Sequence, residues 1–286
     1  MKKEEKQKDP MMISSLATAA LQLFLLAAAV AACLPASGWA APVVDALMRP
    51  ALMVRDPARS VLLGAARAGE RLVAVGERGI IVVSEDGGQH WRQVPVPVSV
   101  TLTAVRFADA RKGMAVGHGG TVLSTTDGGA SWQRRLEGRQ LARLALDAAV
   151  ANGRPELIQD AERLVADGPD KPLLDLMMLD ARRVLVVGAY GLAFYSQDGG
   201  ANWTPWMSRL DNPKALHLYA LRRHGDTLLM AGEQGLLLRS DDAGASFRRL
   251  PSPYQGSFFT AEMPTPAETV VAGLRGNVWH SSDAGA

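Results

Sequence analysis

The sequence contains almost no cysteine. Its single copy among 286 residues is Cys33, which lies in an apolar segment near the N-terminus. The residues that follow therefore hold no disulfide, and the domain that they form must be stabilised by its own apolar core. The sequence also lacks metal-ligand spacing and a phosphate-binding loop, so we expect no metal and no other cofactor.

An excess of charge of either sign is also missing. The formal net charge is +2 at pH 7, which argues against a nucleic acid partner. Lysine is scarce, since only Lys112, Lys171 and Lys214 follow residue 41 and the other basic residues there are arginine. Arginine suits bidentate recognition of carboxylates. A GC-rich genome would give the same bias, so both explanations stay open.

The N-terminal segment resembles a leader. Residues 1–10 are charged, an apolar run extends from about residue 11 to 34, and small residues precede Ala40. This order is typical of a secretory signal cleaved after Ala40. Two alternatives stay open: residues 30–33 resemble a lipobox that would make Cys33 a lipidated tether, and the apolar run is long enough to remain as a membrane anchor. Each of the three fates for residues 1–40 places the domain outside the cytoplasm, in the periplasm.

Five stretches of the sequence align without gaps. Two of them read MAVGHGGTVLSTTDGGASW from Met114 and LVVGAYGLAFYSQDGGANW from Leu185. Their first glycines are Gly76, Gly117, Gly188, Gly232 and Gly273, which are 41, 71, 44 and 41 residues apart. A repeat of about 40 residues fits a four-stranded propeller blade. The longer step indicates an insertion.

Each repeat predicts the same four strands. An apolar first strand is followed by a second that ends at the first glycine, a tight Gly-x-x-Gly turn, a third strand, and a fourth that opens with an aromatic residue. We therefore predict an all-β protein, a β-propeller. Its domain spans residues 60–286, with five visible blades near residues 60–95, 101–136, 173–207, 215–251 and 257–286.

The turn between the third and fourth strands is an Asp box, Ser/Thr-x-Asp-x-Gly-x-x-Trp. We expect the aspartate to accept hydrogen bonds from the backbone just ahead of it, the glycine to allow a positive φ, and the aromatic ring to pack between sheets. The same turn repeats in every blade, so we interpret these acids as structural and not catalytic. The pairs are Asp86 and Trp91, Asp127 and Trp132, Asp198 and Trp203, and Asp242 and Phe247, with Asp283 in a fifth box.

The chain stops at Ala286, inside the fifth box and before its aromatic residue. We therefore expect it to be part of a propeller with six or seven blades, in which residues 41–59 supply a closing strand. An open ring exposes sheet surface and a free edge. We accordingly expect poor solubility.

The repeat AVGxxGxxxxSxDGGxxW resembles the BNR/Asp-box propellers of the photosystem II assembly and stability factor type, over about residues 60–286. The resemblance implies a seven-bladed lumenal or periplasmic propeller that binds assembling membrane proteins. Similar propellers in non-photosynthetic bacteria are linked to envelope exporters. The insertion at residues 138–167 departs from the plain repeat. Bacterial sialidases share the Asp box, but their arginine-isoleucine-proline motif is missing here.

The Gly-x-x-Gly tips and the links between blades lie on one face, because strand directions alternate, and the Asp boxes lie on the other. The tip backbone repeats while its side chains vary, which is typical of a binding face, although solvation alone also allows such variation. The candidate binding residues at the tips are Glu77, Arg78, His118, Tyr190, Glu233, Gln234 and Arg275.

The insertion predicts a helical hairpin on the tip face, broken by the sequence at residues 152–155. Its apolar residues at helical spacing are Leu141, Leu144, Ala145 and Ala148, then Leu157, Ile158, Ala161, Leu164 and Val165. The hairpin is a candidate lid over the propeller mouth or a docking element. The alternative is a cap that only buries its own apolar stripe.

These features favour a non-catalytic scaffold or assembly factor for an envelope or photosystem-type membrane complex. A protein segment of that complex would bind through Arg78, Arg275, Tyr190 and the hairpin. The alternative is a carbohydrate-binding or sialidase-like hydrolase, which needs two carboxylates about 5–10 Å apart. The tip acids Glu77 and Glu233 belong to blades one and four, which predicts too long a separation. A purely structural module is a third interpretation.

Overall fold

The computed structural model describes residues 45–285. The predicted leader at residues 1–40, with Cys33 and its three fates, lies outside the described residues. Within residues 45–285 no helix is both long and apolar enough to span a membrane.

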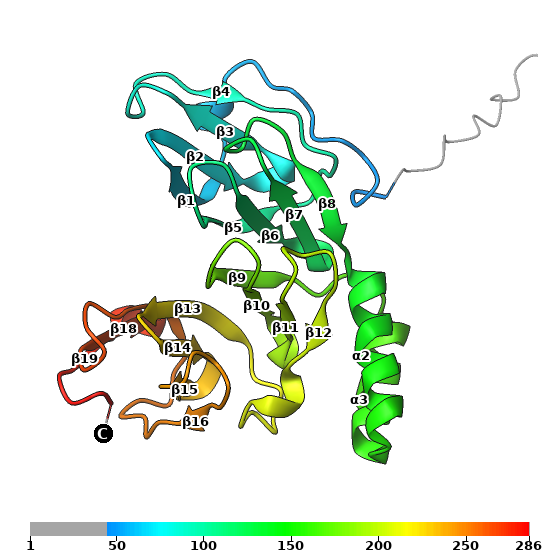
Figure 1. Ribbon diagram of the computed structural model, residues 1–286, viewed down its shortest axis with the longest axis vertical. Coiled ribbons are helices and arrows are strands. Elements are labelled where there is room, and N and C mark those ends of the chain that lie inside the picture. Colours follow the sequence, from blue (N-terminus) through cyan, green and yellow to red (C-terminus); the bar gives the residue numbers. More distant parts are fainter. Residues whose placement is uncertain (1–44, 286) are drawn as a thin grey trace, which may run out of the picture. The chain divides into compact units, whose positions relative to one another are not determined.

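The described chain forms five antiparallel sheets, four with four strands and the fifth with three. Strands follow one another across each sheet in sequence order. The sheets confirm the predicted all-β propeller, one sheet for each repeat (Figure 1). Blade one holds β1 (Leu62–Ala68), β2 (Arg71–Gly76), β3 (Ile81–Ser84) and β4 (Arg92–Gln93); blade two holds β5 (Leu102–Phe107), β6 (Gly113–Gly117), β7 (Thr121–Thr125) and β8 (Gln133–Leu136); blade three holds β9 (Leu173–Met178), β10 (Val184–Gly188), β11 (Ala193–Ser196) and β12 (Thr204–Pro205); blade four holds β13 (Leu218–His224), β14 (Thr227–Gly232), β15 (Leu237–Ser240) and β16 (Arg248–Arg249); blade five holds β17 (Phe258–Glu262), β18 (Thr269–Gly273) and β19 (Val278–Ser281).

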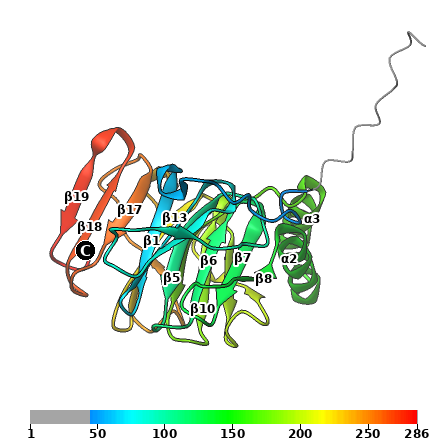
Figure 2. The same cartoon turned by 90° about the horizontal axis from the view of Figure 1, so that it is seen from above.

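The first strand of each blade is the innermost. β1, β5, β9, β13 and β17 contact one another in that order, so that consecutive blades stack face to face around a common axis (Figure 2). Each first strand carries a β-bulge one residue after its start. The bulge breaks the alternation of the strand and turns one extra side chain out of the ladder in every blade.

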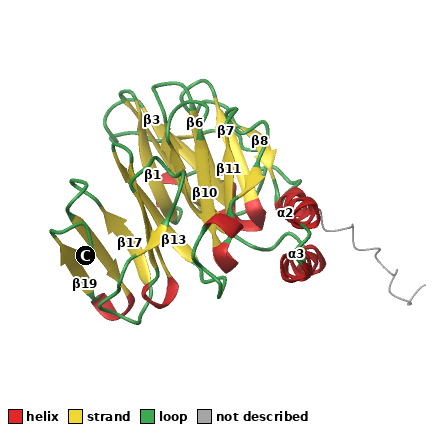
Figure 3. Ribbon diagram, turned by 60° about the horizontal axis from the view of Figure 1, so that its bottom comes forward, coloured by secondary structure: helices red, strands yellow, loops and turns green. Residues whose placement is uncertain are grey.

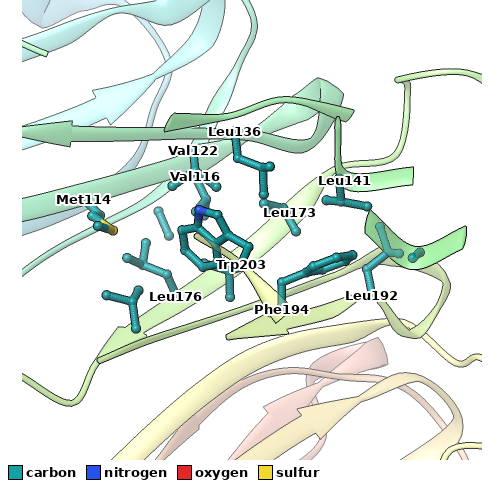
Figure 4. Close-up of a cluster of buried hydrophobic side chains, with 14 of the residues drawn as sticks. Met114, Val116, Val122, Leu136, Leu141, Leu173, Leu176, Leu192, Phe194 and Trp203 are labelled. Carbon is teal, nitrogen blue, oxygen red and sulfur yellow. The ribbon is translucent and has the colours of Figure 1, made fainter. Parts of the chain in front are cut away.

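Apolar clusters fill the spaces between neighbouring blades. The cluster between blades two and three is built around Trp203, which is only 6% exposed (Figure 4). Met114 and Val116 reach it from β6, and Leu176 and Phe194 reach it from blade three. Trp132 occupies the equivalent place between blades one and two. As predicted, the Asp-box aromatic residue of one blade packs against the preceding blade.

The first glycine of each repeat is fixed by a close approach of two strands. A Cβ atom at Gly188 would lie 2.3 Å from the carbonyl oxygen of Pro172, where the first strand of the blade begins. The φ of Gly188 is −165°, which any residue can adopt, so the constraint is space and not conformation. Contacts of 1.9–2.3 Å to the equivalent carbonyl occur at Gly76, Gly117, Gly232 and Gly273.

Gly188→Ala is therefore expected to destabilise the protein by about 1–3 kcal/mol or more, because the strands must separate to admit a methyl group. Urea unfolding followed by circular dichroism measures the loss. Gly225→Ala is the control, since its Cβ would meet nothing within 4 Å and its φ of +59° is the only source of strain. Its expected cost is about 1 kcal/mol. Equal losses in the two variants would contradict the packing argument.

Residues 45–61 include the described part of the segment 41–59, for which a closing strand is predicted, and they contain no strand within the five described sheets. Their only helical turn is η1 (Pro57–Arg59), and the segment packs along blades one and two. Leu47 is buried beneath Gly119, and the Ala51 N–H donates to the Val96 carbonyl at 3.0 Å. These described residues therefore cover part of blades one and two.

The insertion forms two helices, α2 (Gly138–Asn152) and α3 (Pro155–Asp167), as the sequence predicts. The hairpin packs through α2 against β12 and the blade-two tip, on the outer side of blades two and three and away from the axis (Figures 1 and 3). Of the two alternatives for the hairpin, this position does not fit a lid over the mouth, and a docking element stays a prediction. The buried stripe also differs from the predicted one, since Ala142 and Ala149 are buried while Ala148 and Val165 are exposed.

Candidate functional site

All four complete Asp boxes have the same hydrogen bonds to the aspartate carboxylate, and the three with tryptophan share an indole bond as well. In blade three the Asp198 carboxylate accepts from the Asn202 backbone N–H at 2.8 Å and from the Ser196 hydroxyl at 2.9 Å. The indole N–H of Trp203 donates to the Gly200 carbonyl at 3.1 Å. Each carboxylate is thus used within its own turn. The equivalent carboxylates are Asp86, Asp127 and Asp242, and Asp283 accepts from the Ser281 hydroxyl.

These hydrogen bonds stabilise the ionised acids. The hydroxyl and backbone N–H of Ser246, together with the Ser240 hydroxyl, lower the pKa of Asp242 from 3.8 to about 2. At Asp86 the backbone N–H of His90 is the largest cause of a pKa that is held well below the usual range. An acid that binds its proton less readily when folded stabilises the fold above its unfolded pKa.

We therefore expect the Asp-box contribution to the free energy of unfolding to be complete and independent of pH above about pH 4, and to fall as the pH drops from there towards about 2. Urea midpoints measured across this range test the prediction. Asp242→Asn is expected to reduce the slope, because the amide carries no titrating proton. An unchanged slope in that variant would place the acid sensitivity elsewhere.

The tips share one backbone geometry. The second residue of each tip has a left-handed conformation, with φ values of 53° at Arg78, 65° at Gly119, 55° at Tyr190, 52° at Gln234 and 60° at Arg275. Only blade two uses glycine there. A left-handed conformation costs other residues about 1 kcal/mol, so four tips hold a side chain against this cost.

Glu77 and Glu233 have the same structural task in blades one and four. The Glu77 carboxylate accepts from the Val61 backbone N–H at 3.0 Å, and the Glu233 carboxylate accepts from the His217 backbone N–H at 3.1 Å. Both bonds tie a tip to the start of the first strand of its blade. The hydrolase alternative requires these two acids, but each of them is engaged with the backbone of its own blade, Glu77 in blade one and Glu233 in blade four.

An aromatic cluster joins blades three, four and five on the tip side. The Tyr190 ring lies 4.9 Å from the His217 ring, which lies 6.0 Å from Tyr219, and Tyr219 meets Phe259 edge-on at 5.2 Å. Tyr219 and Phe259 are the bulge residues of β13 and β17. Lys171 places its ammonium 5.1 Å from the Tyr190 ring centre. We call these five residues the tip cluster.

The tip cluster combines exposed rings with polar groups. Tyr190 is 55% exposed and Phe259 is 49% exposed, which is unusual for large aromatic side chains. His217 Nδ1 lies 3.2 Å from the Glu233 carboxylate and 3.4 Å from the Tyr190 backbone nitrogen. A proton on Nδ1 would be donated to the Glu233 carboxylate, whereas a lone pair on Nδ1 would accept from the Tyr190 N–H. The His217 ring can therefore make only one of these two hydrogen bonds at a time. Burial raises the pKa of Tyr219, assisted by the charge of Glu233.

The structure brings together only some of the predicted tip residues. Tyr190 and Glu233 meet through His217, whereas Arg78, on blade one, lies 4.0 Å from the Glu77 carboxylate of its own tip. His118 and Arg275 are exposed on blades two and five. Gln234 borders a shallow hollow of about 360 Å³ with Arg249 and Ser252.

Sequence reasoning missed four members of the tip cluster, Lys171, His217, Tyr219 and Phe259. It considered only residues between the two glycines of each repeat. His217 stands where the first strand begins, and the bulge positions are revealed only by the strand register. An alignment of the first strands shows Leu63, Thr103, Leu174, Tyr219 and Phe259 at one position, a contrast in side-chain size that was available as a signal.

The repeats, the blade order and the Asp boxes agree with a known sequence family. The family model for the photosynthesis system II assembly factor YCF48 matches residues 83–154 and 154–286. The chain belongs to this family. No curated protein sequence matches it.

Solved structures similar to this member of the YCF48 family include several kinds of propeller. YCF48 bound to D1 peptide is 18% identical with a TM-score of 0.56, covering 82% of this chain and 67% of that one. The GH74 enzyme of Niastella koreensis is 14% identical with a TM-score of 0.51, covering 79% and 31%. The WD40 propeller domain of Doa1 is 9% identical with a TM-score of 0.53, covering 80% and 67%. At these identities the likeness shows the fold alone.

Membership of the YCF48 family directs attention to protein binding rather than to catalysis. Residues 45–285 contain no group of three or more His, Cys, Asp or Glu side chains arranged to hold a metal ion. The acids of the Asp boxes and of the tips are hydrogen-bonded within the scaffold. The tip cluster exposes the large rings of Tyr190 and Phe259 on the tip face.

Proposed function

We propose that this propeller is a non-catalytic scaffold that binds an extended segment of a membrane or envelope protein during assembly of a complex. The observation that carries the proposal is the tip cluster, where exposed rings of blades three and five and the partly buried Tyr219 of blade four lie beside a lysine and a histidine. We further propose that the domain works in the periplasm, reached by the leader at residues 1–40.

The chemistry of the tip cluster fits a peptide better than a sugar or a small metabolite. Aromatic residues dominate the contact energy of protein interfaces, because they bury much area for little lost conformational freedom. Tyr190 and Phe259 offer such surface, and the partly exposed Glu233–His217 pair offers hydrogen bonds at its border. Membership of the YCF48 family supports a protein partner, as does the D1 peptide bound to YCF48 itself.

Tyr190→Gly separates binding from folding. Blade two already has Gly119 at this position with φ 65°, so the tip backbone accepts glycine. The variant removes the ring and relieves the left-handed strain, so we expect its melting temperature to stay the same or rise. Binding is expected to weaken by about tenfold or more, since exposed aromatic anchors often contribute over 1 kcal/mol. Gln234→Gly, at the same position of blade four, is the matched control.

The measurement is fluorescence anisotropy of labelled peptides with the full chain. The probes are a D1 peptide and a set that covers the extracytoplasmic segments of membrane proteins from the same cell. The proposal predicts that at least one peptide binds, that Tyr190→Gly abolishes most of this binding, and that Gln234→Gly retains it. Failure of every peptide, or equal binding by Tyr190→Gly, would overturn it. Retention of an oligosaccharide instead would favour the carbohydrate-binding alternative.

A further inference from the structure

The helical insertion creates a groove that the plain propeller repeat does not have. On the outer rim α2 contacts β12 of blade three (Figure 1). The groove is lined by α2, by β8 of blade two and by the Asp box of blade three, and its volume is about 440 Å³. Leu136, Leu144 and Trp203 supply apolar lining. It is built from blades two and three and α2, whereas the tip cluster spans blades three to five.

Three arginines line the groove. Arg135 comes from β8, and Arg139 and Arg143 lie one turn apart on α2. Arg139 is paired with Asp45 at 2.8 Å and with Glu137 at 3.6 Å, so its charge serves to hold the N-terminal segment. Arg135 donates to the Ser124 hydroxyl at 2.7 Å and has no carboxylate partner among residues 45–285. Arg143 is exposed and has no ion pair within that same range.

We propose that this rim groove is a second protein-binding site, which takes an acidic segment with an apolar side chain between its carboxylates. The carboxylates would meet Arg135 and Arg143, and the apolar side chain would rest on Leu144 and the edge of Trp203. Two unpaired guanidinium groups attract an anion, and their planar shape suits a bidentate carboxylate. The apolar lining between them favours a peptide over a small inorganic anion.

The construction of the groove supports a fixed docking surface. Arg135 is held in place by Ser124, and Trp203 is fixed by its bond to Gly200 and by the core between blades two and three. Leu141 and Ala145 bury the opposite face of α2 in that same core, which sets the helix beside the groove. A preformed site loses little entropy when its ligand binds. Arginine and tryptophan are also the residues most enriched where binding energy concentrates.

The test compares two double charge reversals in the full chain. Arg135→Glu with Arg143→Glu alters the groove. Arg55→Glu with Arg92→Glu changes the net charge by the same amount at two exposed arginines that lack an ion pair among the described residues. The probes are labelled peptides in which acidic pairs flank a leucine or phenylalanine, and the same peptides with Asn and Gln in place of the acids. Anisotropy is read at low salt and again at higher salt.

We expect the acidic peptides to bind and their amide counterparts to fail. The groove reversal should weaken binding by about tenfold or more, because it repels the ligand as well as losing its partners. The Arg55/Arg92 reversal should stay within about twofold, because Arg92 lies on blade one, Arg55 lies in the segment beside it, and neither lines the groove. Tyr190→Gly should leave this binding unchanged, which separates the groove from the tip cluster.

Three results would overturn the proposal. Equal weakening in both reversals would mean that only the net charge matters. Absence of binding by every acidic peptide would remove the site. Capture of anionic lipid vesicles, with loss of that capture in the groove reversal and no peptide binding, would assign the arginines to a membrane surface instead. Melting temperatures of both reversals establish that the variants are folded.

Discussion

Asp175→Ala is expected to cost about 3–5 kcal/mol of stability, because it leaves two arginines near the axis without their shared partner. Asp175 lies on β9 and is 4% exposed. Its carboxylate accepts from Arg106 at 2.9 Å and from Arg222 at 3.0 Å. These arginines occupy equivalent positions on β5 and β13, so one acid of blade three joins the inner strands of blades two and four.

The Asp175 carboxylate has four donors in all. The backbone N–H groups of Leu176 and Leu221 supply the other two, at 2.9 and 3.0 Å. Removing the acid therefore takes a shared acceptor from two charged and two neutral donors in a largely buried place, although Arg222 keeps its bond to Glu262. Removing one member of such a network lowers the free energy of unfolding strongly, because its partners stay buried and uncompensated. The net contribution of the intact network to stability is smaller than this loss.

Urea unfolding followed by tryptophan fluorescence measures the effect of Asp175→Ala. The control is Glu262→Ala, which removes the second and more exposed carboxylate partner of Arg222. Glu262 accepts from Arg222 at 3.0 Å, but its side chain is 71% exposed, and we expect a change of no more than about 1 kcal/mol. Similar losses in the two variants would show that burial does not decide the cost.

Trp203→Ala is expected to destabilise the protein by about 3–5 kcal/mol, through the cavity that it opens between blades two and three. The ring is enclosed by Met114 and Leu136 of blade two and by Phe194 of its own blade (Figure 4). Truncation removes its contacts with both blades at once. The gap cannot close easily, because the strands on each side are held in separate sheets.

Trp91→Ala isolates the part of this effect that comes from packing between blades. Trp91 has the same place in the blade-one Asp box, and its indole donates to the Gly88 carbonyl at 3.0 Å, as Trp203 donates to Gly200 at 3.1 Å. Its ring is only partly buried and packs against its own blade. We expect it to cost about 1–2 kcal/mol, and equal urea midpoints for the two variants would contradict this account.

Trp203 and Tyr190 also separate stability from function in this molecule. The loss expected for Trp203→Ala arises in the core between blades, although its ring edge lines the rim groove. Tyr190→Gly acts at an exposed tip and is expected to spare the fold. A variant that loses peptide binding without losing stability therefore reports on the tip face, whereas a loss of both reports on the scaffold.

The sequence by itself determined the blades. Spacing of the glycines, alternation of apolar strands and the Asp-box turns are local signals, and each turn closes with hydrogen bonds inside one repeat. The helix break at Gly153 is equally local, since its left-handed conformation ends α2. For this reason the strands of the repeats and both helices were predictable without knowledge of the tertiary structure.

Only the tertiary structure decided where side chains from different blades meet. The tip cluster depends on bulges that turn Tyr219 and Phe259 out of their ladders, and on the stacking of blades three to five. Asp175 lies in an apolar strand, and its sequence gives no sign that two arginines 69 residues before and 47 residues after it converge on its carboxylate. The hairpin likewise lies on the rim because α2 packs its apolar residues into the core between blades two and three. Long-range packing sets these positions, and the repeat pattern contains no record of it.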